Sequence, residues 1–206
     1  IAVYYAITGQ FDTVFLLVIL AAVFDFMDGV AARALHAYSP LGKELDSLAD
    51  MVSFGVVPGV IAFSLMRAGE MPLWISFTGF LIPVFSGYRL AKFNIDERQT
   101  QSFIGLPTPA NALFWIGIST AYAELLTSNA WIIPQIVFVF SILLVSEIPM
   151  FSLKFKNLSM SENKTRYIFL AGCIALIVIF GLKSMSFIIA WYILWSIFVF
   201  LFTKRA

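Results

Sequence analysis

Four aspartates stand close together in a strongly apolar sequence, and their spacing indicates what chemistry they could do. They are Asp25, Asp28, Asp46 and Asp50. The members of the first pair are i and i+3 and those of the second are i and i+4, so each pair lies on one face of its own predicted helix. A charge at membrane depth costs about 3 kcal/mol or more unless it is paired, wetted or bound to a metal. The four carboxylates therefore indicate a functional site, which a short connection near residues 39–41 could assemble.

Carboxylates gathered in a small volume repel one another, and a divalent cation removes that repulsion. Oxygen ligands without His or Cys suit hard ions such as Mg²⁺, Mn²⁺ or Ca²⁺ rather than Zn²⁺. Two such ions would fit the ligand count and would serve phosphoryl chemistry. Arg33 lies two helical turns beyond Asp25 and can pair with a phosphate. Gly29 and Gly42 let a bulky ligand approach the backbone. The combination predicts a pyrophosphate site.

Two other interpretations of these residues stay open at this point. Acidic residues in a protein with many spans can form the pathway of a cation transporter. The two glycines, taken alone, are also typical of close packing between transmembrane helices. A transporter would move metal ions across a membrane, whereas a transferase would release a reaction product.

The composition identifies an integral membrane protein. Of 206 residues, 61% are hydrophobic and 12% are charged, whereas soluble domains carry roughly 25% charged residues. At about 20 apolar residues per span, about eight spans fit, the first of them incomplete. The prediction is an all-α, polytopic helical bundle forming a single membrane domain over residues 1–206. No nucleic-acid partner is expected. The expected helices are 1–7, 11–35, 42–66, 73–91, 108–126, 130–150, 166–182 and 184–203.

Basic residues are distributed unevenly between the two ends of these predicted helices. One end receives only Arg67 and Lys183. The other receives Arg33, Lys43, Arg89, Lys92, Arg98, Lys154, Lys156, Lys164, Arg166, Lys204 and Arg205. By the positive-inside rule the basic end is cytoplasmic. Because the aspartates lie near that end, the sequence predicts a multi-pass protein of the cytoplasmic membrane whose site faces the cytoplasm.

The run from Asp25 to Asp50 reads D-x2-D-G-x2-A-R-x8-G-x3-D-x3-D, with every fixed position filled. It resembles the signature of the CDP-alcohol phosphatidyltransferases. The resemblance implies a six-helix membrane core, about residues 1–152, followed by additional helices at about 166–203. It also implies two bound divalent metals, a CDP-linked lipid and a homodimer.

The same resemblance implies a role for each motif residue. Asp25, Asp28 and Asp46 would be metal ligands, and Asp50 would be both a metal ligand and the general base. The residues that would bind the CDP and its phosphates are Asp28, Gly29, Ala32, Arg33, Gly42 and Asp46. The metal is expected to be Mg²⁺ or Mn²⁺, and Ca²⁺ can occupy such a site.

Neighbouring stretches resemble the phosphatidylserine synthases of this family. They are residues 45–59, 88–94, 103–112 and 146–158. The implied reaction joins L-serine to CDP-diacylglycerol and gives phosphatidylserine and CMP. Another acceptor alcohol stays an alternative: glycerol 3-phosphate, inositol phosphate or choline.

Serine carries a carboxylate, so its pocket needs a cation. Arg89 is the first candidate because it ends a predicted span on the cytoplasmic side, and the rivals are Lys92, Lys154 and Lys156. The alternative is that these four residues only anchor helix ends in the interface.

Overall fold

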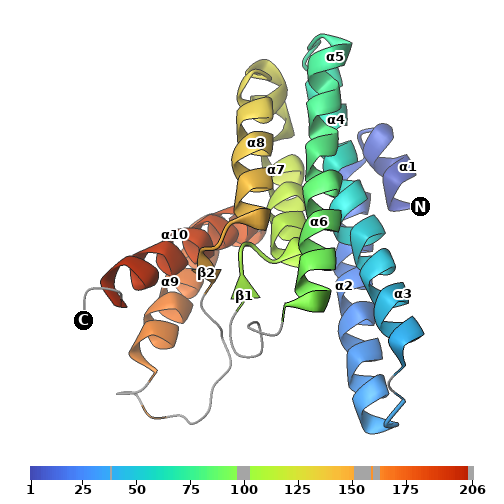
Figure 1. Ribbon diagram of the computed structural model, residues 1–206. Helices are drawn as coiled ribbons and strands as arrows, with labels where there is room; N and C mark the ends of the chain where they lie inside the picture. The colour runs from blue at the N-terminus through green and yellow to red at the C-terminus, as the bar shows by residue number, and fades with distance from the viewer. Residues whose placement is uncertain (38, 97–102, 151–158, 160–162, 204–206) are drawn as a thin grey trace.

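The computed structural model describes residues 1–37, 39–96, 103–150, 159 and 163–203, and nearly all of them are helical (Figure 1). The helices of the first half are α1 (Ala2–Ile7), α2 (Phe11–Ala34), α3 (Pro40–Asp50), α4 (Val57–Ala68), α5 (Leu73–Ser76) and α6 (Leu81–Ile95). Those of the second half are α7 (Thr108–Ser128), α8 (Ile132–Val145), α9 (Lys164–Phe180) and α10 (Met185–Thr203). The predicted all-α class is confirmed.

Helices occupy all eight of the segments in which spans were expected. Among the described residues, three continuous helical stretches are long and apolar enough to cross a membrane: Phe11–Ala34, Pro40–Ala68 and Leu73–Ile95. Shorter apolar helices cover Ile132–Val145 and Met185–Leu201. The first of these has 14 residues, which is fewer than the ~20 that a span needs on its own. Long and short apolar helices together define a helical membrane protein.

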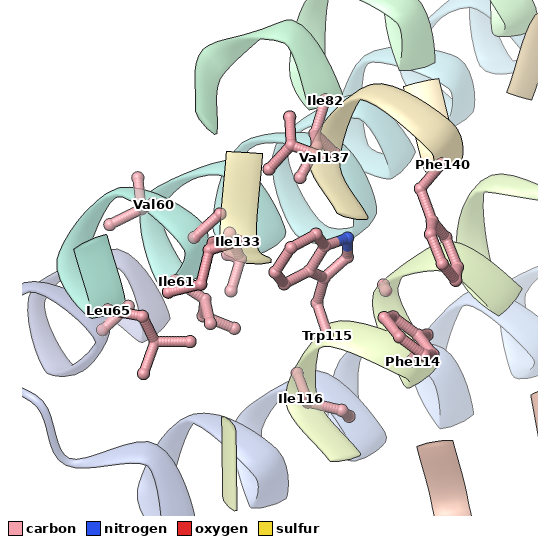
Figure 2. Packing of buried hydrophobic residues seen from close by; sticks show 14 of the residues in the cluster. Val60, Ile61, Leu65, Ile82, Phe114, Trp115, Ile116, Ile133, Val137 and Phe140 are labelled. Atoms are coloured by element: carbon pink, nitrogen blue, oxygen red, sulfur yellow. The ribbon is translucent and has the colours of Figure 1, made fainter. Parts of the chain in front are cut away.

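The core lies among α4, α6, α7 and α8, which pack side by side (Figure 2). Its largest fully buried side chain is Trp115 of α7, which is 0% exposed. The ring of Phe114 stacks on that of Phe140 with centroids 4.0 Å apart, which joins α7 to α8. Large apolar residues packed in this way resist displacement. The four packed helices α4, α6, α7 and α8 therefore form a firm scaffold.

A π-helical turn, Met51–Val56, follows Asp50 directly and joins α3 to α4. Pro58 follows closely and has no backbone N–H to offer the carbonyl four residues earlier, which favours an irregular helix here. Glycines let this part of the chain approach α6 closely. A Cβ added to Gly55 would lie 3.0 Å from the Cβ of Ser86, and one added to Gly59 would lie 2.7 Å from Pro83. This contact brings the end of α3 next to α6.

Two very short strands, β1 (Phe103–Ile104) and β2 (Pro149–Met150), pair antiparallel and were not predicted. They join the chain before α7 to the chain after α8. Gly105 follows β1 with a φ of +76°, and its N–H donates to the carbonyl of Ile148 at 2.9 Å. A Cβ at this position would lie 2.6 Å from the carbonyl oxygen of Leu144. Only glycine fits this turn without strain.

Candidate functional site

The aspartates lie on α2 and α3, which form a helical hairpin at one end of the molecule (Figure 1). Ser39 sets the start of α3: its backbone is extended, and its Oγ accepts a hydrogen bond from the N–H of Gly42 at 3.0 Å. Pro40 occupies the first helical turn, where its missing N–H costs nothing. Gly42 thus has a local role as well, since a Cβ there would lie 3.0 Å from the Oγ of Ser39.

Three of the four aspartates converge into one cluster. One carboxylate oxygen each from Asp25, Asp28 and Asp46 lie within 4.8 Å of one another. The carboxyl of Asp50 contacts that of Asp25. Asp28 and Asp46 are exposed and the other two are half-buried. Because a hard cation takes oxygen ligands at about 2.0–2.6 Å, oxygens on opposite sides of one ion lie about 4–5 Å apart. The cluster therefore fits a divalent metal.

A cavity of about 820 Å³ lies beside the cluster, between the end of α2 and α3. Its lining residues are Asp28, Gly29, Ala32, Arg33, Ala37, Ser39, Pro40, Gly42, Lys43, Leu45, Asp46 and Ala49. All six residues predicted to bind CDP and its phosphates are among them. We call this space the large cavity. The structure brings the whole predicted nucleotide set to one place, with Arg33 and Asp28 on the same wall.

A second cavity, of about 280 Å³, lies between α3, α6 and the start of α7, and we call it the small cavity. It is lined by Lys43, Asp46, Ser47, Asp50, Arg89, Leu90, Phe93, Asn94, Pro107 and Pro109. Lys43 and Asp46 line both cavities. Asp46 of the carboxylate cluster thus borders both cavities, and Asp50 borders the small one.

Arg89 is the predicted serine-binding residue that the structure places in the small cavity. It is 6% exposed, and one of its terminal nitrogens donates to the Oγ1 of Thr108 at 3.3 Å. Its guanidinium carbon lies 5.7 Å from the centroid of the Phe93 ring. The guanidinium also interacts electrostatically with Asp50. A buried, oriented cation beside the proposed base suits an anionic acceptor group.

The other three predicted serine-binding residues are placed differently. Lys92 forms an ion pair with Glu147 of the segment after α8, and it does not line the small cavity. Lys154 and Lys156 lie outside the described residues.

The sequence interpretation missed three polar residues of the small cavity, which are Lys43, Ser47 and Asn94. The Nζ of Lys43 donates to the carbonyl of Asn94 at 2.8 Å, and the Nδ2 of Asn94 donates to the Oγ of Ser47 at 2.9 Å. One signal was available, because Lys43, Asp46, Ser47 and Asp50 follow the i, i+3, i+4, i+7 spacing of one helical face. Asn94, their partner on α6, has no comparable spacing pattern in the sequence.

The structure defines a helical membrane protein with a carboxylate site suited to a divalent cation, set between two cavities. A sequence model of the CDP-alcohol phosphatidyltransferase family matches residues 1–145. The chain belongs to that family, which confirms the resemblance found in the motif.

Curated relatives carry the name CDP-diacylglycerol–serine O-phosphatidyltransferase. The Bacillus subtilis protein is 38% identical over 102 residues, which are 50% of this chain and 57% of that protein. The Mycobacterium leprae protein is 35% identical over 156 residues, 71% of this chain and 51% of that protein. A Helicobacter pylori protein is 37% identical over 116 residues, 54% of this chain and 48% of that protein. The chain spans about half the length of these relatives.

Proposed function

We propose that the protein transfers the phosphatidyl group of CDP-diacylglycerol to the hydroxyl of L-serine and forms phosphatidylserine and CMP. One observation carries this proposal: the large cavity, lined by the whole nucleotide motif, meets the small cavity with its buried Arg89 at Asp46. A transferase needs separate places for donor and acceptor that meet at the reacting phosphate. The names of the relatives support serine as the acceptor.

The large cavity is proposed to hold the donor. Asp25, Asp28 and Asp46 would hold the divalent cation beside this cavity, with Asp50 as a further ligand. When bound, Mg²⁺ or Mn²⁺ would neutralise the diphosphate and stabilise the departing phosphate of CMP. Ca²⁺ can occupy the same site. Arg33 pairs with a phosphate oxygen. Gly29, Ala32 and Gly42 leave room for the nucleotide because they carry little or no side chain.

The small cavity is proposed to hold the acceptor. Arg89 binds the carboxylate of serine and turns the hydroxyl towards Asp50, which accepts its proton as the bond to phosphorus forms. The serine oxygen attacks in line, the phosphorus–oxygen bond to CMP breaks, and CMP leaves with the electron pair. Lys92, Lys154 and Lys156 stay weaker candidates for serine binding.

The cellular setting is also a proposal. The excess of basic residues at the site's end of the helices supports a multi-pass protein of the cytoplasmic membrane with both cavities open to the cytoplasm. Serine and CMP are water-soluble, so this orientation gives both of them access. A homodimer stays a prediction from the family.

The test uses purified protein, CDP-diacylglycerol, Mg²⁺ or Mn²⁺ and a panel of alcohols, with CMP release as the readout. Serine is expected to support metal-dependent release, and glycerol 3-phosphate, inositol phosphate and choline are not. Preference for one of those alcohols would replace serine as the acceptor. Metal flux in liposomes without CMP release from any alcohol would favour a transporter instead.

A further inference from the structure

Three hydrogen bonds close a ring between α3 and α6. The Nζ of Lys43 donates to the carbonyl of Asn94 at 2.8 Å. The side-chain amide of Asn94 donates to the Oγ of Ser47 at 2.9 Å. The hydroxyl of Ser47 in turn donates to the backbone carbonyl of Lys43 at 3.2 Å. We call these three residues the α3–α6 clamp.

The clamp connects the two helices that carry the acceptor chemistry. Ser47 lies three residues before Asp50, on the same face of α3. Asn94 lies in the last turns of α6, five residues after Arg89. On the other side of Asp50 the π-helical turn packs on α6, with Gly55 against Ser86 and Met51 against Gly87. The clamp therefore holds α3 against α6 on one side of Asp50 and Arg89, and the π-helical turn holds them on the other side.

The clamp belongs to the small cavity more than to the large one. All three of its residues line the small cavity, whereas Ser47 and Asn94 do not line the large one. Loss of the bond between Ser47 and Asn94 would let α3 and α6 separate where the acceptor binds. The lining of the nucleotide space comes only from α2, α3 and the residues between them, so it does not depend on a contact with α6.

We propose that Ser47 and Asn94 are positioning residues for the acceptor, which act by fixing the distance between Asp50 and Arg89. The proposal rests on the function proposed above. It assigns these two side chains neither to metal binding nor to nucleotide binding. The bond between their side chains is the element that sets how tightly the acceptor alcohol is held.

The test compares four variants with the wild type by steady-state kinetics, with serine and CDP-diacylglycerol varied separately. Ser47→Ala and Asn94→Ala each remove the bond and are expected to raise the KM for serine about three- to tenfold, as the loss of one hydrogen bond does. The KM for CDP-diacylglycerol stays near that of the wild type. Ser47→Thr keeps a hydroxyl and restores the wild-type KM for serine. The double variant is no worse than either single one, because both remove the same bond.

A matched control and distinct outcomes complete the design. Ser128→Ala removes a helix hydroxyl that bonds to the carbonyl of Glu124 at 2.8 Å, at the far end of α7, and should change neither KM. Additive effects in the double variant would overturn the proposal, as would equal rises in both KM values. A wild type that releases no CMP with serine would instead overturn the proposed function, so the two failures are distinguishable.

Discussion

At the scale of single residues, four aspartates of one motif occupy two environments. Asp28 and Asp46 are exposed and line the large cavity, whereas Asp50 is half-buried, lines the small cavity and faces Arg89. Asp46 also lines the small cavity, so it borders both halves of the proposed reaction, whereas Asp50, four residues further along the same helix, belongs to the acceptor half alone. This difference in surroundings supports the proposal that Asp50 moves a proton while the other aspartates chiefly hold a cation.

Asp50→Asn should separate these two tasks. The substituted amide cannot accept the proton of serine, so turnover should fall at least about a hundredfold, in the range that general-base catalysis contributes. Binding of CDP should change little, because asparagine keeps an oxygen that can ligate a hard cation and position 50 does not line the large cavity. Incorporation of radiolabelled serine measures turnover, and calorimetry with CDP measures binding. Glu44→Gln, an exposed neighbour on α3, is the control; turnover equal to the wild type in Asp50→Asn would rule out the base assignment.

Arg89→Lys tests the proposed contact with the serine carboxylate. Lysine keeps the positive charge but loses the planar fork that binds a carboxylate with two hydrogen bonds. The KM for serine should rise about tenfold or more, while the KM for CDP-diacylglycerol stays unchanged. Lys92→Gln is the comparison, since that lysine is engaged with Glu147 outside the small cavity. If Lys92→Gln raised the KM for serine and Arg89→Lys did not, the two roles would be exchanged.

At the scale of the helices, the sequence was informative where contacts are local. The positions of α2 and α3, and the shared face of each aspartate pair, follow from spacings of three and four residues that any helix imposes. Ser39 and Pro40 are ordinary start signals for α3. The α3–α6 clamp could not be predicted in this way, because it joins positions 51 and 47 residues apart in the chain.

The same limit applies to the π-helical turn and to the β1–β2 pair. A proline at position 58 indicates an irregular helix but does not say which form it takes. Strands of two residues have too few side chains for an alternating pattern to be seen. Lys92 shows the limit for charges: its position predicted a substrate contact or an interface anchor, and its partner Glu147 is 55 residues away.

The turn at Gly105 offers a test of the contact between α7 and the end of α8. Gly105→Ala puts an alanine in the left-handed backbone region and places its Cβ against the carbonyl of Leu144. Stability should fall by about 3 kcal/mol or more. Gly9→Ala is a close control, since Gly9 has a φ of +74° with nothing within 4 Å of an added Cβ, and should cost only about 1 kcal/mol. Thermal unfolding in detergent compares them; equal losses would mean that the crowding at Gly105 is relieved by small shifts.

At the scale of the whole molecule, orientation in the membrane can be measured with single cysteines. In a Cys173→Ser background, Glu44→Cys marks the site's end of the bundle and Ser128→Cys marks the far end of α7; both side chains are exposed. A thiol reagent that cannot cross the membrane should label position 128 in intact cells and position 44 only in inverted vesicles. The reverse pattern would place the site on the outer side, and labelling at both positions in intact cells would indicate a leaky preparation, which a cytoplasmic marker enzyme detects.

The large cavity is built from residues 28–49 alone, whereas the small cavity draws its wall from α3, α6 and the start of α7. The large cavity is thus formed by one short stretch of sequence, whereas the small cavity needs segments that are far apart in the sequence. A mutation in α6 or at the start of α7 is expected to alter the choice of alcohol without touching the nucleotide space, whereas a mutation among the residues at 28–42 that line only the large cavity should affect every alcohol alike. One donor module can therefore persist through evolution while the acceptor wall beside it diversifies.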